Sequence, residues 1–246
     1  MATARDSQPM VSIVVPVFNE AERIGVSLQK IDEFMRDSSR TWELIVVDDG
    51  STDETAAIVS RSKVTALRFI RNNRNHGKGY AVRQGVLAAT GNYVLFTDAD
   101  LSAPIEESAK LLDVPLNQNA DVVIESRAVD RSYIEKHQSR FRELGGMAFN
   151  VMVRSLLSLP LHDTQCGFKL FHREKSRGIF ERQTTYGFGF DPELLFLAKR
   201  QGLRIREVPV RWSHSEGSKV RFLRHAVVMF MDLVRIRWNA LIGKYR

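Results

Sequence analysis

The stretch Tyr93-Val94-Leu95-Phe96-Thr97-Asp98-Ala99-Asp100 indicates the fold class of this chain of 246 residues. Its apolar part predicts a strand buried on both faces, and its two carboxylates follow where that strand leaves the sheet. In open α/β sheets, ligands bind at this carboxyl edge. Two acids so close repel each other unless a cation lies beside them, and Mg²⁺ or Mn²⁺, completed by phosphate oxygens, suits such a site. Taken alone, the pair fits an acidic turn before the helix after Pro104 equally well.

The composition is that of a basic globular protein. Hydrophobic residues make up 43% of the chain and charged residues 26%, which allows a sizeable core and argues against global disorder. The net charge of +7 favours anionic partners, namely nucleotides, nucleic acid or an anionic membrane surface. The single Cys166 cannot form an internal disulfide, which fits a reducing compartment. We expect neither a secretory signal in Met1–Pro9 nor a stretch of the roughly 18 apolar residues that a spanning helix needs.

Strand and helix patterns alternate in the first hundred residues and predict a mostly parallel central sheet flanked by helices. Pro16 has no N–H for a ladder, so we expect the first strand to end there or to lie at an edge. Ser51 to Asp53 offer an N-cap for the second helix. The strands expected before Asp98 are Met10–Val17, Trp42–Val47, Ala66–Ile70 and the opening stretch, and the helices are Glu20–Met35, a segment through Ser60, and Tyr80–Ala89.

Paired acids follow two of these strands, at Asp48/Asp49 and at Asp98/Asp100. Both pairs should lie on the same edge of a parallel sheet, which favours a cleft for a metal-bound or hydroxyl-rich ligand over chance acidic turns. No Gly-x-Gly-x-x-Gly follows the first strand and no Gly-x-x-x-x-Gly-Lys-Ser/Thr occurs, which disfavours a dinucleotide-binding dehydrogenase and a phosphate-loop ATPase. No cluster of Cys and His suggests zinc.

The second half also mixes helix and strand patterns, without an internal repeat or a linker. Val129–Arg142 is polar and is expected to be a mobile loop or a solvated helix. Asp191 is expected to cap a helix that has Pro192 in its first turn. The expected helices are Ile105–Leu116, Phe141–Leu159, Lys175–Glu181, a segment ending at Arg200, and Phe222–Ile242; the expected strands are Asp121–Ile124, the tail of His162–Phe171, and Arg204–Trp212, with a polar loop over Ser213–Lys219.

Several motifs resemble those of a known family. In the first half they are Pro16-Val17-Phe18-Asn19-Glu20, Val47-Asp48-Asp49-Gly50-Ser51, Asn75-His76-Gly77-Lys78-Gly79 and Asp98-Ala99-Asp100. Together they are similar to the large family of inverting nucleotide-sugar glycosyltransferases with the GT-A fold. In the second half, Ser126-Arg127, Asp163-Thr164-Gln165-Cys166-Gly167-Phe168-Lys169-Leu170-Phe171 and Glu216-Gly217-Ser218-Lys219 resemble the dolichyl-phosphate glucosyltransferase and mannosyltransferase branch, and the second string looks closer to the glucosyl enzymes.

The resemblance implies one GT-A catalytic domain over residues 1–246, with a nucleotide-sugar half at 10–103 and an acceptor half at 104–246. Asp100 matches the family's direct metal ligand, for Mg²⁺ or Mn²⁺, and Asp98 is expected to share that ion. The positions expected to bind the donor are Pro16, Phe18 and Glu20 (base and ribose, Tyr being common where Phe18 stands), Val47 and Asp49 (base), Lys78 (the basic loop), and Asp98 and Ala99 (ribose and phosphate). The positions expected at the diphosphate or the acceptor are Arg127, Lys219, Asp163 and Gln165.

Two departures from the family pattern bear on the substrate. The eukaryotic glucosyl enzymes usually carry an N-terminal membrane anchor, which we do not expect from this sequence, and the mannosyl enzymes carry an Arg where this chain has Ser213. Both favour a prokaryotic-type soluble relative that acts on another polyprenyl phosphate, and they weaken the case for GDP-mannose.

The chemistry of the residues agrees with the resemblance. A nucleoside diphosphate leaves readily once a divalent cation and basic residues neutralise its charge. A lipid phosphate acceptor needs no general base; a hydroxyl acceptor needs one, and Asp163 is then either that base or a loop acid that caps a turn. We therefore expect an inverting, metal-dependent transferase that moves glucose from UDP-glucose to a polyprenyl phosphate. The alternatives are GDP-mannose as donor, a polysaccharide or other soluble acceptor, and a basic nucleic-acid-binding protein, which would leave the aligned acids unexplained.

A lipid acceptor requires an element that brings the site to a membrane. Phe222–Ile242 has apolar residues at helical spacing with basic residues among and beside them, which fits an interfacial helix on anionic lipid. The same stripe fits a core helix or a homo-oligomer contact. With the loop Val129–Arg142, such a helix would place the protein peripherally on the cytoplasmic face of a membrane. The stripe consists of Phe222, Leu223, Val227, Phe230, Met231, Val234, Trp238 and Leu241.

Overall fold

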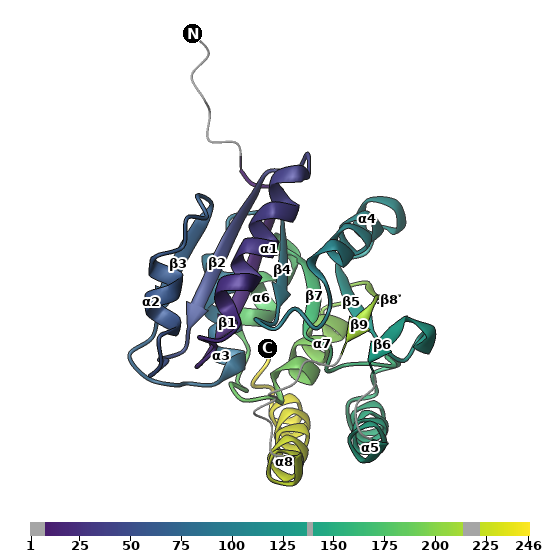
Figure 1. The fold of residues 1–246 in the computed structure, drawn as a ribbon. Coiled ribbons are helices and arrows are strands. Elements are labelled where there is room, and N and C mark those ends of the chain that lie inside the picture. The colour runs from purple at the N-terminus through teal and green to yellow at the C-terminus, as the bar shows by residue number, and fades with distance from the viewer. Residues whose placement is uncertain (1–7, 137–139, 214–221) are drawn as a thin grey trace.

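The computed structural model describes residues 8–136, 140–213 and 222–246, and these form a seven-stranded sheet with helices on both faces (Figure 1). The strand order is β3-β2-β1-β4-β7-β5-β8, and β6 and β9 form a separate two-stranded sheet. The strands are β1 Val11–Val17, β2 Trp42–Asp48, β3 Leu67–Arg71, β4 Tyr93–Thr97, β5 Val122–Ser126, β6 Ile134–Lys136, β7 Phe168–His172, β8 Ile205–Pro209 and β9 Trp212–Ser213. The helices are α1 Ile24–Asp37, α2 Thr55–Ser60, α3 Lys78–Ala88, α4 Ser108–Gln118, α5 Arg140–Leu157, α6 Arg173–Glu181, α7 Phe190–Arg200 and α8 Phe222–Leu241.

The predicted parallel arrangement is confirmed for the first half, where β3, β2, β1 and β4 are all parallel. One strand of the large sheet runs the other way. β7 lies between β4 and β5 and pairs antiparallel with both, whereas β5 and β8 are again parallel. The start of β7 therefore lies at the same edge as the ends of β4 and β5.

Two apolar cores hold the layers together, one on each face of the sheet. Helices α1, α2 and α4 cover one face, where Leu28 and Leu111 belong to the same apolar cluster as residues of β1 and β4. Helices α3, α6 and α7 cover the other, where Val82 and Leu194 belong to a second cluster with other residues of the same central strands. All seven residues of β1 are buried, because both of its faces carry helices. This packing explains why β1 and β4 are apolar runs without alternation.

The first strand continues through Pro16. Pro16 is paired in register with Val47 of β2, while the pairing of β1 with β4 has already ended at Val14. Pro16, which lacks an N–H, therefore lies beyond the part of β1 that pairs with β4. The strand ends one residue later, at Val17. For the second helix, the N-cap position is Glu54, although the Asp53 carboxylate does accept a hydrogen bond from the Thr55 amide, at 3.0 Å.

Three expectations for the second half were wrong in detail. The segment after Val129 contains a 3₁₀ turn at Arg131–Tyr133 and the strand β6, which pairs with β9, so its polar residues belong to a small sheet. Residues 204–212 form two strands in different sheets rather than one, separated after Pro209. Asp191 lies within the first turn of α7, after the N-cap Gly189, because a buried lysine engages its carboxylate.

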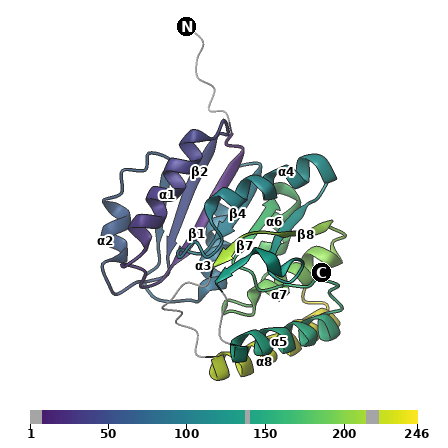
Figure 2. The same ribbon diagram turned by 45° about the vertical axis from the view of Figure 1, so that its right-hand side comes forward.

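Helices α5 and α8 lie side by side and pack against α7, beneath the rest of the molecule (Figure 2). Leu233 and Ile236 of α8 are fully buried. The predicted apolar stripe is a different face of the helix: Met231 is 59% exposed and Trp238 is 61% exposed. The stripe therefore does not pack on the sheet as a core helix would. Within the described residues, no helix is both long enough and apolar enough to cross a bilayer.

Candidate active site

The predicted site residues gather along the carboxyl edge of the sheet. Phe18 and Glu20 follow β1, Asp49 follows β2, and Asp98 and Asp100 follow β4. The loops after β3 and β5 add Lys78 and Arg127, and the loop before β7 adds Asp163 and Gln165. Both acid pairs therefore lie at one edge of the sheet, as predicted, and residues from the second half of the chain join them there.

The segments after β1 and β2 are bound to each other. Asn19 adopts a left-handed conformation, with φ of 55°, and its side-chain oxygen accepts a hydrogen bond from the Thr52 amide, at 2.8 Å. The Glu20 amide donates to the Thr55 hydroxyl, at 2.7 Å. Phe18 is 37% exposed at this edge, while Pro16 and Val47 are buried within the sheet.

Asp49 organises the basic segment that leads into α3, which we call the donor loop (residues 72–79, of which the last two begin α3). One of its carboxylate oxygens accepts the Asn72 side-chain amide, at 2.9 Å. The other accepts the backbone amides of His76, at 2.9 Å, and Gly77, at 2.7 Å. Because Asp49 is 2% exposed, these bonds satisfy a carboxylate that would otherwise be costly to bury. The bonds to His76 and Gly77 fix the backbone that leads to Lys78.

Asp98 lies between the two halves of the site. Its Oδ1 pairs with Lys78 Nζ at 2.6 Å. On its other side, a Cβ atom added to Gly167 would lie 2.7 Å from Asp98 Cγ, so only glycine fits there. Burial alone would lower the pKa of Lys78, but the Asp98 carboxylate outweighs it, and the pKa is raised. The lysine is thus held as a cation beside Asp98.

Asp100 remains open to solvent, with 27% of its side chain exposed. Its Oδ1 accepts the Ser102 amide at 3.0 Å, and Arg23 Nη1 lies 4.0 Å from Oδ2. The described residues contain no group of three or more His, Cys, Asp and Glu side chains that could hold a metal. Mg²⁺ commonly uses one or two carboxylates and takes its other ligands from phosphate and water, and Asp98 and Asp100 fit that pattern.

Arg127 is fixed by a carboxylate and an aromatic ring. Its Nε and Nη2 donate to the two oxygens of Asp163, at 2.6 Å and 3.0 Å, and its Cζ lies 5.3 Å from the centre of the Trp212 ring. Burial alone would raise the pKa of Asp163, but the charge and hydrogen bonds of Arg127 lower it. The backbone amide of Gln165 also donates to Asp163, at 3.3 Å.

Three buried ionisable residues near this edge were missed by sequence reasoning. Lys169 of β7 is fully buried and pairs with Asp191 of α7 at 2.6 Å; its Nζ also donates to the Cys166 carbonyl, which precedes Gly167. Burial raises the pKa of Glu125 to about 8, against the attraction of Arg127. A lysine within an apolar strand is a usable sequence signal, because a buried cation requires a partner.

Lys219 lies outside the described residues. The last described residue before it is Ser213, whose backbone amide donates to the Ser102 carbonyl at 2.9 Å. This bond joins β9 to the loop that carries Asp100.

The similarities to known proteins agree with this arrangement. The model of the family described as "Glycosyl transferase family 2" matches residues 12–180, which include the donor loop, both pairs of acids and Arg127. This chain belongs to glycosyl transferase family 2. It is therefore a glycosyltransferase, and its mostly parallel sheet with flanking helices is the GT-A fold.

Relatives within this glycosyltransferase family match almost the whole chain. A protein named dolichyl-phosphate beta-glucosyltransferase from Dictyostelium discoideum is 33% identical, over 96% of this chain and 76% of its own length. Proteins of the same name from Saccharomyces cerevisiae and Homo sapiens are 35% and 34% identical, over 98% and 96% of this chain and 78% and 77% of theirs. The predicted resemblance to this branch is confirmed.

Solved structures of other glycosyltransferases share the fold. Glucosyl-3-phosphoglycerate synthase from Mycobacterium tuberculosis, in complex with Mn²⁺, UDP-glucose and phosphoglyceric acid, superposes with a TM-score of 0.66 at 23% identity, over 96% of this chain and 80% of that one. Mannosyl-3-phosphoglycerate synthase from Rubrobacter xylanophilus gives a TM-score of 0.68 at 20% identity, over 96% and 75%.

Proposed function

We propose that this glycosyltransferase moves glucose from UDP-glucose to a dolichyl-type polyprenyl phosphate. The observation that carries the proposal is the identity of 33% to 35% with three proteins named dolichyl-phosphate beta-glucosyltransferase, over at least 96% of this chain. That similarity spans the acceptor half as well as the donor half. UDP-glucose as donor is supported by the glucosyl transfer in the relatives' names.

The reaction requires inversion at the sugar. The bond from glucose C1 to the diphosphate of UDP-glucose is an α-glycoside. An oxygen of the acceptor phosphate attacks C1 from the opposite face, the C1–O bond to UDP breaks, and a β-linked glucosyl phosphate and UDP result. The acceptor oxygen is already anionic, so no proton has to be removed.

The donor site in this proposal lies over β1, β2 and β4. Phe18, Glu20 and Asp49 surround the base and ribose, and Lys78 neutralises charge on the diphosphate. A divalent cation held by Asp100 and Asp98 would supply further positive charge to the departing UDP. The resemblance to the family supports these roles, and the shared sheet edge makes them compatible.

Arg127 is the residue that we assign to the phosphate of the acceptor or donor. Its Nη1 is not engaged by Asp163, whose two oxygens bind Nε and Nη2. Because the acceptor needs no base and the pKa of Asp163 is lowered, Asp163 acts in this proposal by holding Arg127 in place rather than by accepting a proton. Lys219 remains a proposed phosphate contact.

The outer faces of α5 and α8 form the proposed contact with the membrane. Met147 and Val151 of α5 are 48% and 61% exposed, next to the exposed stripe of α8 that includes Met231 and Trp238. The exposed Arg235 and Arg237 flank that stripe. Apolar and basic residues together on one helical face suit an anionic lipid surface, where the acceptor resides. We define this surface by those six residues and call it the lipid face.

The decisive experiment measures the transfer of labelled glucose from UDP-glucose to polyprenyl phosphate in vesicles with Mn²⁺. Label should enter the lipid phase, and removal of divalent ions with EDTA should stop it. GDP-mannose and 3-phosphoglycerate test the other donor and a soluble acceptor. If mannose, or the soluble acceptor, is used in preference, the proposed substrates are wrong.

Asp100→Ala tests the metal site within the same assay. We expect transfer to fall on the order of a hundredfold or more, while the melting temperature stays near that of the wild type. Asp113→Ala is the matched control, because Asp113 is 55% exposed and pairs only with Arg40 among the contacts described. Near-normal, still metal-dependent transfer by Asp100→Ala would place the ion elsewhere.

A further inference from the structure

The segment between α6 and α7 is hydrogen-bonded to the donor loop. The Gly79 amide donates to the Tyr186 carbonyl at 2.8 Å, and the Gln183 side chain donates to the Gly79 carbonyl at 2.9 Å. A Cβ atom added to Gly77, whose φ is 107°, would lie 3.0 Å from the Tyr186 carbonyl carbon. These contacts lie on both sides of Lys78 and thereby fix its backbone. We call residues 183–189 the supporting segment.

A fully buried carboxylate of α7 holds the supporting segment. Glu193 accepts the Thr184 amide at 3.0 Å, the Thr184 hydroxyl at 2.6 Å and the Thr185 amide at 2.7 Å. A buried carboxylate bonded to backbone amides stabilises one conformation of the segment, because any other would leave the charge without partners.

Helix α8 and the turn after it complete the same network. The Tyr245 hydroxyl donates to Glu193 at 2.6 Å, and the Asn239 side chain donates to the Thr184 hydroxyl at 3.1 Å. Burial, together with the Glu193 charge, raises the pKa of Tyr245 to about 12, so the phenol keeps the proton that it donates. At the other end of the segment, a Cβ atom on Gly189 would lie 2.6 Å from Asp232 Cβ on α8.

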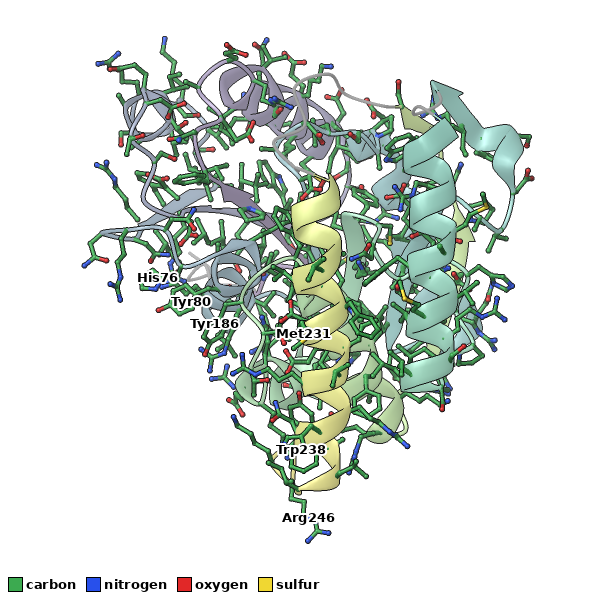
Figure 3. All side chains as sticks on the ribbon, turned by 90° about the horizontal axis from the view of Figure 1, so that it is seen from below. His76, Tyr80, Tyr186, Met231, Trp238 and Arg246 are labelled. Atoms are coloured by element: carbon green, nitrogen blue, oxygen red, sulfur yellow. The ribbon has the colours of Figure 1, made fainter. Side chains whose placement is uncertain are left out.

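Contacts therefore run without a break from α8 to the donor loop. Figure 3 labels Tyr80 and Tyr186, whose rings meet edge to face at 5.3 Å. Tyr80 also stacks on His76 of the donor loop, at 4.5 Å. The path passes from Tyr245 through Glu193, Thr185 and Tyr186 to Gly79, every step a hydrogen bond or a covalent neighbour.

We infer that Tyr245 and Glu193 are positioning residues for the donor: through the supporting segment they hold Lys78 where it meets the diphosphate of the nucleotide sugar. This inference rests on the proposed function, since it takes the donor loop to bind UDP-glucose. It adds that recognition of the donor depends on α8, which also carries most of the lipid face.

The test is Tyr245→Phe, which keeps the ring that packs against Phe196 and removes only the hydroxyl. We expect the KM for UDP-glucose to rise roughly three- to tenfold, which matches the net contribution of one typical hydrogen bond. The KM for polyprenyl phosphate and kcat should stay near wild type. Thr184→Val should have the same effect by removing the other hydroxyl on Glu193. Tyr93→Phe is the control, since Tyr93 lies at the opposite end of β4.

Hydrogen–deuterium exchange of the Gly79 amide measures the positioning without any transfer. Exchange at Gly79 should quicken in Tyr245→Phe and Thr184→Val but not in Tyr93→Phe. An unchanged KM for UDP-glucose with unchanged exchange would overturn the inference. Equal changes in both KM values and kcat would also overturn it, because they would indicate a general loss of structure. If wild-type protein transfers no glucose, the proposed function fails, and the Gly79 exchange still decides whether the coupling exists.

Discussion

Asp98, in the first half of the chain, lies directly against Gly167, in the second half. The Asp98 carboxylate occupies the space that a side chain at position 167 would need. Lys169, two residues further on, donates to the Cys166 carbonyl and so holds the peptide that forms this contact. The geometry of the proposed metal and diphosphate site therefore depends on a backbone segment from the other half of the chain.

Gly167→Ala should impair catalysis more than folding. The added methyl would push the Asp98 carboxylate away from Lys78, so we expect a large loss of kcat and a higher Mn²⁺ concentration for half-maximal activity. The control is Gly146→Ala, since a Cβ atom there meets nothing within 4 Å and Ala favours the helix by about 0.5–1 kcal/mol. Metal titration of transfer compares the two variants. Wild-type Mn²⁺ dependence in Gly167→Ala would show that Asp98 can move without consequence.

Arg127→Lys should lose most of the activity although the charge is kept. A lysine cannot donate two parallel hydrogen bonds to Asp163, so its ammonium would not be directed as the guanidinium is. We expect a loss on the order of 2–4 kcal/mol in transition-state stabilisation, measured as kcat/KM. Asp163→Asn should cost less than Asp163→Ala. The opposite result would be a wild-type kcat that falls as the pH drops through a pKa near 7, together with loss of this pH dependence in Asp163→Asn. That result would identify Asp163 as a general base.

Asp121 should contribute stability that acid removes. Burial alone would raise its pKa, but hydrogen bonds from Arg204 and Lys175 outweigh burial and lower it. An acid with a lowered pKa stabilises the fold fully above its unfolded pKa of about 3.9 and loses that contribution as the pH falls below it. Asp121→Asn should cost about 1–2 kcal/mol at pH 7, because both cations are half-exposed. Urea unfolding should show the gap to wild type narrowing below about pH 4; a constant gap would refute this origin.

The lipid face predicts binding to anionic vesicles. Replacing Met231 and Trp238 together by serine should abolish sedimentation with anionic liposomes at low salt, while transfer to a detergent-solubilised acceptor persists. Val26→Ser is the matched control, because Val26 is 58% exposed on α1, on the other side of the sheet. If wild-type protein stays in the supernatant at low salt, the peripheral-membrane proposal fails. If the serine variant dissociates a dimer, the stripe is an oligomer contact.

The sequence predicted the donor side of the site better than the acceptor side. Each parallel strand there is an apolar run that ends in a polar motif, so the parallel arrangement and the shared edge follow from the pattern alone. The proposed acceptor side depends on pairings between strands that leave no local signal in the sequence. The antiparallel entry of β7 and the pairing of β6 with β9 join segments far apart in the chain, and Trp212 reaches Arg127 only through them.

Charge within the core was the other feature that pattern reading could not resolve. Lys169 lies in an apolar run that predicts a strand correctly, but its partner Asp191 was expected to cap α7. Capping and ion pairing use the same residue type near a helix N-terminus, and only the fold brings Lys169 close enough to decide between them.

Because β7 runs antiparallel to its neighbours, sequence changes in the segment before it need not affect the strands that carry the donor residues. Residues 163–167 arrive at the sheet edge instead of departing from it, and the ladder begins only at Phe168. The chain between Leu157 and Asp163 can therefore change in length or composition without shifting the register of any strand that carries a donor residue. Under the proposed function, recognition of a new acceptor can evolve in this segment while the strands that precede Asp49 and Asp98 keep their pairing.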